Sequence, residues 1–191
     1  QSGSIFHEQD LYDEAIEMYR KSFVLDSIQG DTLNMVNGMR DIAQAYRHKN
    51  EIERSIYCYN KAYRLSEKAG NIILTNSVLL SLASLYKSQG NLSFTHSLLS
   101  KVLPNISNNM KSPAYSLAAD LFKKEGNLDS MYCYCQKLLT VGTVYAKEYA
   151  TGEMYEYYSM KGDFGKAVAY MRMNRKLTDS IRTIDATQSV E

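Results

Sequence analysis

The chain has 191 residues, of which 45% are hydrophobic, and its formal net charge is +1. This length allows one sizeable domain or a short repeat array, and the hydrophobic content is sufficient for a packed core, so a disordered chain is excluded. The near-neutral charge argues against a dedicated nucleic-acid binder, and no apolar run of about 18 residues is present that would span a membrane.

A recurring turn signal divides the chain from start to end. In each copy an aromatic residue stands four positions before the turn and an apolar residue stands two positions after it. The turn residues, in chain order, are Asp10, Asn50, Gly90, Gly126 and Gly162. Their spacing of 36–40 residues is typical of an array of helical repeats.

Each copy is predicted to consist of a helix, a tight turn and a second helix. In the second copy, the apolar face before the turn is Met39, Ile42, Ala43 and Tyr46, and the face after it is Ile52, Ser55, Tyr59 and Ala62. Both sets have the spacing of one helix face. The Gly-Asn pairs at 90–91 and 126–127 are predicted to stop the first helix in a left-handed conformation and reverse the chain. Small residues such as Ala83, seven positions before the turn, should let the paired helices approach closely.

These copies are expected to form one array over residues 1–191. Its parts are an incomplete copy at 1–29, copies at 30–70, 71–108, 109–143 and 144–182, and a helical tail at 183–191. Gly30 in "IQGD" and Gly70 in "KAGN" are expected to end second helices, and Gly142 to play the same part. The segment "NISNNMKSP" (105–113) is expected to be a longer, looser connector.

This pattern resembles the tetratricopeptide repeat (TPR) family, in its variety with repeats of 40 residues. The segments that carry the resemblance are "AYRHKNEIERSIYCYNKA" (45–62), "LYKSQGNLSFTHSLLSKV" (85–102), "LFKKEGNLDSMYCYCQKL" (121–138) and "YSMKGDFGKAVAYMRMN" (158–174). "FHEQDLYDEAIEMYRKS" (6–22) is similar to the family's second helix. The resemblance implies an all-α, right-handed α-α superhelix of antiparallel helix pairs. It also implies a non-catalytic protein-interaction domain, a scaffold that binds a peptide or protein segment in a concave groove.

The family's register places a set of polar residues on the concave face of the first helices. The set is Asn37, Arg40, Gln44, Arg47, Lys87, Lys123 and Lys124. Cations with neighbouring amides suit a carboxylate-rich peptide, so the expected partner is a protein or peptide, and an acidic one is favoured. The competing interpretation is that these are ordinary solvated charges on helix surfaces.

Two short phrases, "LDSI" (25–28) and "TDSI" (178–181), are similar to TPR segments of bacterial signalling and transcription regulators. That resemblance implies the alternative function, a sensory or regulatory input domain of a larger membrane-anchored regulator, and it slightly favours an extracytoplasmic setting over the cytoplasm. The incomplete first copy leaves an open edge through which two copies could pair as a homodimer.

Other chemistries have no support in the sequence. The histidines His7, His48 and His96 fall in different copies, and no nucleotide-binding or nucleophile motif is present, so neither a metal nor a cofactor is expected. Cys58, Cys133 and Cys135 lack the spacing of a disulfide framework and are interpreted as small buried hydrophobes.

The last copy has two unusual features. In "GEMYEYYSMKG" (152–162), Met154, Tyr155 and Tyr158 are expected to face the core, which leaves Tyr157 exposed. Asn174 occupies a position where the core favours Ala or Leu, as expected for the solvent-facing end of an array.

Overall fold

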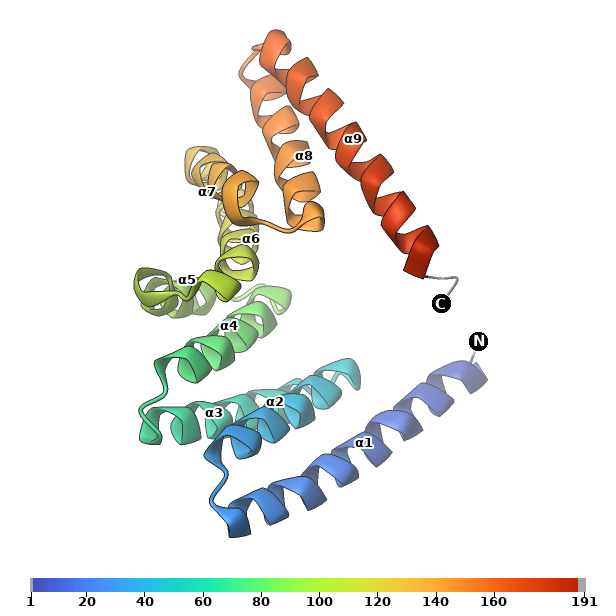
Figure 1. The fold of residues 1–191 in the computed structure, drawn as a ribbon, viewed down its shortest axis with the longest axis vertical. Coiled ribbons are helices and arrows are strands. Elements are labelled where there is room, and N and C mark those ends of the chain that lie inside the picture. Colours follow the sequence, from blue (N-terminus) through green and yellow to red (C-terminus); the bar gives the residue numbers. More distant parts are fainter. Residues whose placement is uncertain (1, 189–191) are drawn as a thin grey trace. The chain divides into compact units, whose positions relative to one another are not determined.

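The computed structural model describes the backbone of residues 2–188 and the side chains from Leu11 to Gln188. Within this range the chain is helical and contains no strand, which confirms the all-α prediction (Figure 1). The elements are α1 (Ser2–Gln29), α2 (Thr32–His48), α3 (Ile52–Lys68), α4 (Ile72–Ser88), α5 (Leu92–Val102), the 3-10 turn η1 (Leu103–Asn105), α6 (Asn108–Lys124), α7 (Leu128–Val141), α8 (Val144–Met160) and α9 (Phe164–Gln188).

The chain divides into two compact units, Gln1–Pro104 and Asn105–Glu191. Within each unit, helices that follow one another in the sequence pack together. The first helices of successive copies are also in contact, α2 with α4 and α6 with α8. No described helix is long and apolar enough to cross a membrane.

The turns inside the copies confirm the role predicted for the Gly-Asn pairs. Gly90 and Gly126 have φ of 74° and 73°, in the left-handed region that glycine adopts without strain. The asparagine that follows each glycine donates its backbone N–H to the carbonyl of the aromatic residue before the turn, Tyr86 or Phe122. Its side chain then caps the next helix by accepting a backbone N–H, so the pair ends one helix and begins another.

Small residues lie where the paired helices meet, as the spacing predicted. Ala43, Ala83 and Ala119 are all fully buried. In the first unit the facing residue of the second helix carries a hydroxyl group, and both Ser55 and Thr95 are fully buried. Close helix packing at these points therefore leaves no room for a larger side chain.

Two local predictions are wrong. First, α1 runs without a break through Asp10, because "EQDLYDEA" offers no glycine or asparagine to adopt a left-handed conformation. Gly142 ends α7 as predicted, but it does so with an extended backbone, with φ −74° and ψ 154°. A Cβ atom there would lie 2.5 Å from the Leu138 carbonyl oxygen, so close packing is what requires glycine.

The second correction concerns the expected loose connector at 105–113. α6 already begins at Asn108, and Pro113 lies inside this helix. Pro113 is the sixth residue of α6, so the helix forgoes the hydrogen bond to the Asn109 carbonyl oxygen and accommodates the proline ring beside that carbonyl.

Candidate functional site

The predicted polar face of the first unit lies on α2 and its neighbour α4. Asn37, Arg40, Gln44 and Arg47 all come from α2, at the spacing of one helix face, and Lys87 comes from α4. Gln44 is exposed, whereas both arginines and Lys87 are half-buried. Because α2 and α4 lie side by side, the structure brings these five predicted residues onto adjacent helices of one unit.

A buried tyrosine lies close to the two arginines of this face. Tyr59 of α3 is 1% exposed, and its side chain hydrogen-bonds with Ser81 of α4. Burial raises the pKa of the Tyr59 hydroxyl above its ordinary value, while the positive charges of Arg47 and Arg40 oppose that shift. Both guanidinium groups are therefore close enough for their charge to act on the same hydroxyl group.

The two arginines keep unused hydrogen-bonding capacity. The Arg40 Nη1 atom donates to the Asn37 Oδ1 atom over 3.4 Å, and the Arg40 Nε atom is buried with no hydrogen-bond partner. Among the side chains described from Leu11 onward, neither Arg40 nor Arg47 forms an ion pair with a carboxylate. Their charges remain available to an acidic group from another molecule.

The remaining two predicted residues, Lys123 and Lys124, belong to the second unit. The Lys123 Nζ atom lies 2.7 Å from the Glu153 Oε2 atom and 3.1 Å from the Glu156 Oε2 atom, both on α8. Hydrogen bonds to these carboxylates, that to Glu153 first, raise the pKa of the Lys123 ammonium group. Lys124 is exposed. The charge of Lys123 is thus balanced inside the protein.

The sequence missed Glu153 as the main partner of Lys123, because this pairing depends on how α6 and α8 face each other. The two glutamates lie three residues apart on α8, so both reach the same side of the helix. Nearby, the Tyr149 hydroxyl is buried without a hydrogen-bond partner, and burial, reinforced by Glu153, raises its pKa strongly. Lys123 on the α6/α8 face therefore carries internally paired charge, unlike Arg40 and Arg47 of α2.

Three predicted placements of single side chains are wrong. Tyr155 is 40% exposed and not part of the core, whereas Tyr157 is half-buried and stacks on Tyr132 with ring centroids 4.8 Å apart. Cys133 is exposed, and only Cys58 and Cys135 are buried.

The other residues singled out from the sequence have ordinary structural surroundings. The ring of His48 stacks on Tyr12, His96 is exposed, and the side chain of His7 lies outside the described residues. In the described part of the chain no group of three His, Cys, Asp or Glu side chains could hold a metal ion. Asn174 bonds to α8 by donating to the Glu148 carbonyl oxygen over 2.6 Å.

The phrases "LDSI" and "TDSI", which carried the resemblance to regulators, lie inside α1 and α9. In the first phrase, the carbonyl oxygens of Asp26 and Ser27 accept the backbone N–H groups of Asp31 and Gly30 at the end of α1. Both phrases are short stretches of helix surface.

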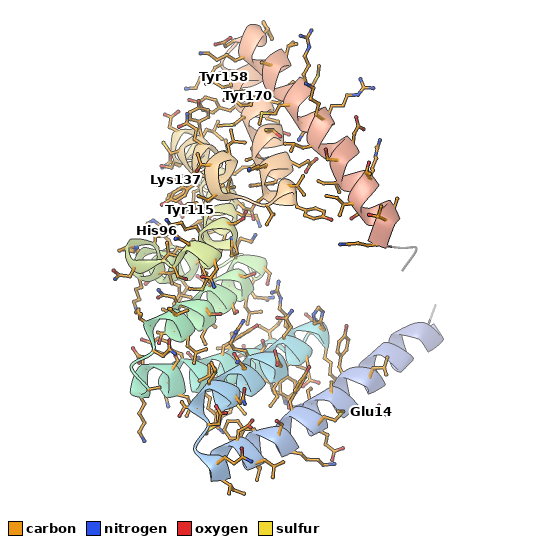
Figure 2. The ribbon with its side chains drawn as sticks, in the orientation of Figure 1. Glu14, His96, Tyr115, Lys137, Tyr158 and Tyr170 are labelled. Atoms are coloured by element: carbon orange, nitrogen blue, oxygen red, sulfur yellow. The ribbon has the colours of Figure 1, made fainter. Side chains whose placement is uncertain are left out.

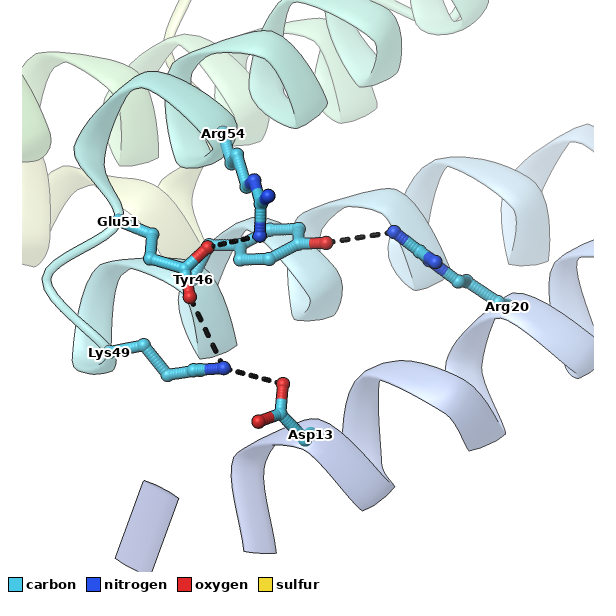
Figure 3. A network of polar contacts seen from close by, with 6 residues as sticks. All are labelled: Asp13, Arg20, Tyr46, Lys49, Glu51 and Arg54. Atoms are coloured by element: carbon cyan, nitrogen blue, oxygen red, sulfur yellow. Dashed lines mark hydrogen bonds and ion pairs between the residues drawn. The ribbon is translucent and has the colours of Figure 1, made fainter. Parts of the chain in front are cut away.

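A network of charges that the sequence did not reveal links α1, α2 and α3 (Figure 3). The Lys49 Nζ atom lies 2.5 Å from the Asp13 Oδ1 atom and 3.2 Å from the Glu51 Oε1 atom. Arg54 pairs with Glu51 and lies over the ring of Tyr46, and the Arg20 Nη2 atom donates to the Tyr46 hydroxyl over 2.8 Å. This network forms one wall of a cavity of about 820 Å³.

No protein-family model matches the sequence, and no curated protein sequence matches it. Solved structures do share its fold. BtubC (BKLC) from P. vanneervenii gives a TM-score of 0.68 at 11% identity, over 93% of this chain and 92% of that chain. A putative kinesin light chain from Podosopora anserina with nearly identical TPR-like repeats gives 0.67 at 11% identity, over 94% and 93%. A substituted variant of the same kinesin light chain gives 0.66 at 13% identity, over 95% and 94%.

At these identities the likeness concerns the fold alone. It confirms the TPR-type solenoid fold that the repeated turn signal and the helix faces predicted.

Proposed function

We propose that the protein is a non-catalytic interaction domain whose α2/α4 face binds a peptide or protein segment rich in carboxylates. TPR-type folds commonly mediate contacts between proteins, and such repeats present extended binding surfaces. The observation that carries the proposal is the state of Arg40 and Arg47. Both are half-buried on one face, and among the described side chains neither is paired with a carboxylate.

The surroundings of the arginines favour a carboxylate over a simple counter-ion. Asn37 holds the Arg40 guanidinium group in place, and Gln44 offers an exposed amide beside it. A guanidinium group whose position is fixed loses less conformational entropy when it forms paired hydrogen bonds to a carboxylate. Lys87 of α4 adds a positive charge from the neighbouring helix. We do not assign Lys123 to the binding face, because Glu153 and Glu156 already neutralise its charge.

The test is the binding of a fluorescein-labelled peptide that contains several Asp and Glu residues and ends in a free carboxylate, measured by fluorescence anisotropy. Reversing both charges in R40E/R47E should reduce affinity by at least about tenfold, because two charge-assisted contacts become repulsive. Higher salt should weaken binding to the parent protein.

A matched control reverses two exposed cations elsewhere in the same unit. Lys68 of α3 and Lys101 of α5 are both exposed, so K68E/K101E changes the net charge equally without touching α2 or α4. It should bind the peptide nearly as well as the parent does. Unchanged binding by R40E/R47E would overturn the proposed site. Equal losses of affinity in R40E/R47E and K68E/K101E would also overturn it, because the effect would then come from overall charge.

A further inference from the structure

The charge network of Figure 3 has a counterpart in the second unit, and the comparison shows where the two differ. Asp13, Tyr46, Lys49, Glu51 and Arg54 correspond to Asp129, Tyr158, Lys161, Asp163 and Lys166. The contacts correspond as well. Lys161 pairs with Asp129, Lys166 pairs with Asp163, and Lys166 lies over the ring of Tyr158. A similar set of contacts therefore holds α1, α2 and α3 together in the first unit and α7, α8 and α9 together in the second unit.

In the second unit, tyrosine rings fill the space behind this network. Tyr132 of α7 hydrogen-bonds through its hydroxyl to the Tyr158 hydroxyl over 2.8 Å. Tyr170 of α9 stacks on Tyr158 with ring centroids 5.5 Å apart, and Figure 2 shows these two side chains together. Aromatic clusters of this kind bury large areas in a defined geometry.

In the first unit the equivalent rings are missing. When α1 is aligned with α7 on Asp13 and Asp129, Ile16 aligns with Tyr132. When α3 is aligned with α9 on the turns that precede them, Cys58 aligns with Tyr170. Both smaller residues line the 820 Å³ cavity between α1 and α3, together with Tyr46 and the 68% exposed Tyr57. Two positions that carry aromatic rings in the second unit thus carry smaller side chains in the first unit, and both of these line the cavity.

The charges around this space also differ between the units. Glu14 and Glu17 of α1 and Glu53 of α3 line the cavity, and all three are exposed. None of them forms an ion pair among the described side chains. The corresponding residues in the second unit are Ser130, Cys133 and Gly165, all uncharged. Arg20 and Arg54 also line the open space, but Arg54 is paired with Glu51 and the acidic residues outnumber the two arginines.

We infer that the α1/α3 cavity is a second docking site, for a helical protein segment that inserts an aromatic side chain flanked by Lys or Arg. The inserted ring takes the place that Tyr132 and Tyr170 occupy in the second unit, against Tyr46 and Tyr57. The flanking cations meet Glu14, Glu17 and Glu53. This is the helix-in-groove mode of recognition, with an aromatic anchor in a pocket and a charged rim. The site is separate from the α2/α4 face and selects the opposite charge.

The experiment uses the full chain and a labelled, acetylated and amidated peptide with the sequence of residues 164–180. This peptide is the basic, aromatic helix that carries Tyr170 together with Lys166, Arg172 and Arg175. Binding is measured by fluorescence anisotropy. C58Y places a ring in the cavity from within and should lower affinity at least about tenfold, whereas C58S keeps the cavity open and should bind like the parent.

Two further measurements keep the result interpretable if C58Y folds poorly. The E17Q/E53Q variant changes only exposed positions and should lower the affinity for the peptide severalfold. A peptide carrying Y170A should bind at least about tenfold more weakly than the parent peptide. Unchanged binding in a folded C58Y, or in E17Q/E53Q, would overturn the inference. Free tyramine binding as tightly as the peptide would overturn the assignment to a protein segment. R40E/R47E should leave this peptide unaffected, so the two proposed sites can fail independently.

Discussion

The Ser55 hydroxyl donates a hydrogen bond to the carbonyl oxygen of Ala43 over 2.7 Å, between α2 and α3. The next copy repeats this relationship, since the Thr95 hydroxyl reaches the Ala83 carbonyl oxygen at 3.4 Å. Both alanines and both hydroxyl residues are fully buried. A polar group thus lies at the closest approach of each helix pair in the first unit, and it has a partner, so its burial is not destabilising.

Ala83→Leu should destabilise the protein by about 1–3 kcal/mol, because no space remains between α4 and α5 for three more carbon atoms. Urea unfolding followed by circular dichroism measures the effect. The control is Ala169→Leu on α9, at an exposed position, which should change the free energy of unfolding by less than about 0.5 kcal/mol. A substituted Ala83 protein as stable as the parent would mean that the helix register is wrong.

The turn between α4 and α5 predicts a pair of opposite effects. Gly90 has φ +74° with open space around a Cβ atom, so Gly90→Ala should cost about 1 kcal/mol through backbone strain alone. Asn50 has φ 60° at the equivalent turn of the preceding copy, so Asn50→Gly should be neutral or slightly stabilising there. Thermal unfolding of both variants tests this, and a destabilised Asn50→Gly protein would contradict it.

The three cysteines should react at very different rates. Burial raises the pKa of the Cys135 thiol to about 12 and also raises that of Cys58, whereas Cys133 is exposed. Because the thiolate is the reactive form, a raised pKa leaves less of it at any pH below the shifted value. At pH 8 iodoacetamide should modify Cys133 first, and the other two should react only after unfolding. Mass spectrometry of timed samples measures the order, and early modification of Cys135 would contradict its burial.

The ion pairs of Lys123 predict a stability effect confined to one of two neighbouring lysines. Lys123→Glu would bring a third carboxylate beside Glu153, whose side chain is 12% exposed, and should destabilise the protein by about 1 kcal/mol or more. Lys124→Glu, at an exposed position, should have almost no effect. Equal unfolding midpoints for the two variants would show that the pairs contribute nothing measurable.

The helical architecture could be predicted from the sequence because local signals repeat. Each turn combines a left-handed residue with a following helix cap, and the faces before and after it have helical spacing, so several weak signals agree. Where one signal stood alone, prediction failed. Asp10 had the right aromatic neighbour, but it lacked a residue able to adopt a positive φ, and α1 continues through it. Gly142 ends α7 as predicted, but the sequence did not show that close contact with Leu138 is what requires glycine there.

The site was less predictable, because its properties depend on contacts between helices. The register placed Arg40 and Arg47 on one face of α2, and the structure agrees. It could not show that Lys123 is neutralised by Glu153, since that pairing depends on how α6 and α8 face each other. The α1/α3 cavity left a readable trace, the change from tyrosine to Ile16 and Cys58 at equivalent positions. Its meaning depends on knowing that Tyr132, Tyr158 and Tyr170 meet in space.

The packing of each helix against its neighbours in the sequence has a consequence for how the chain folds. Nearly all contacts within a unit join segments that a short turn already holds together, so the sequence separation of contacting residues is small. Closing such contacts costs little loop entropy, and proteins of low contact order fold quickly. Folding can therefore begin at any of several helix pairs and spread along the chain, without waiting for one distant pair of segments to meet.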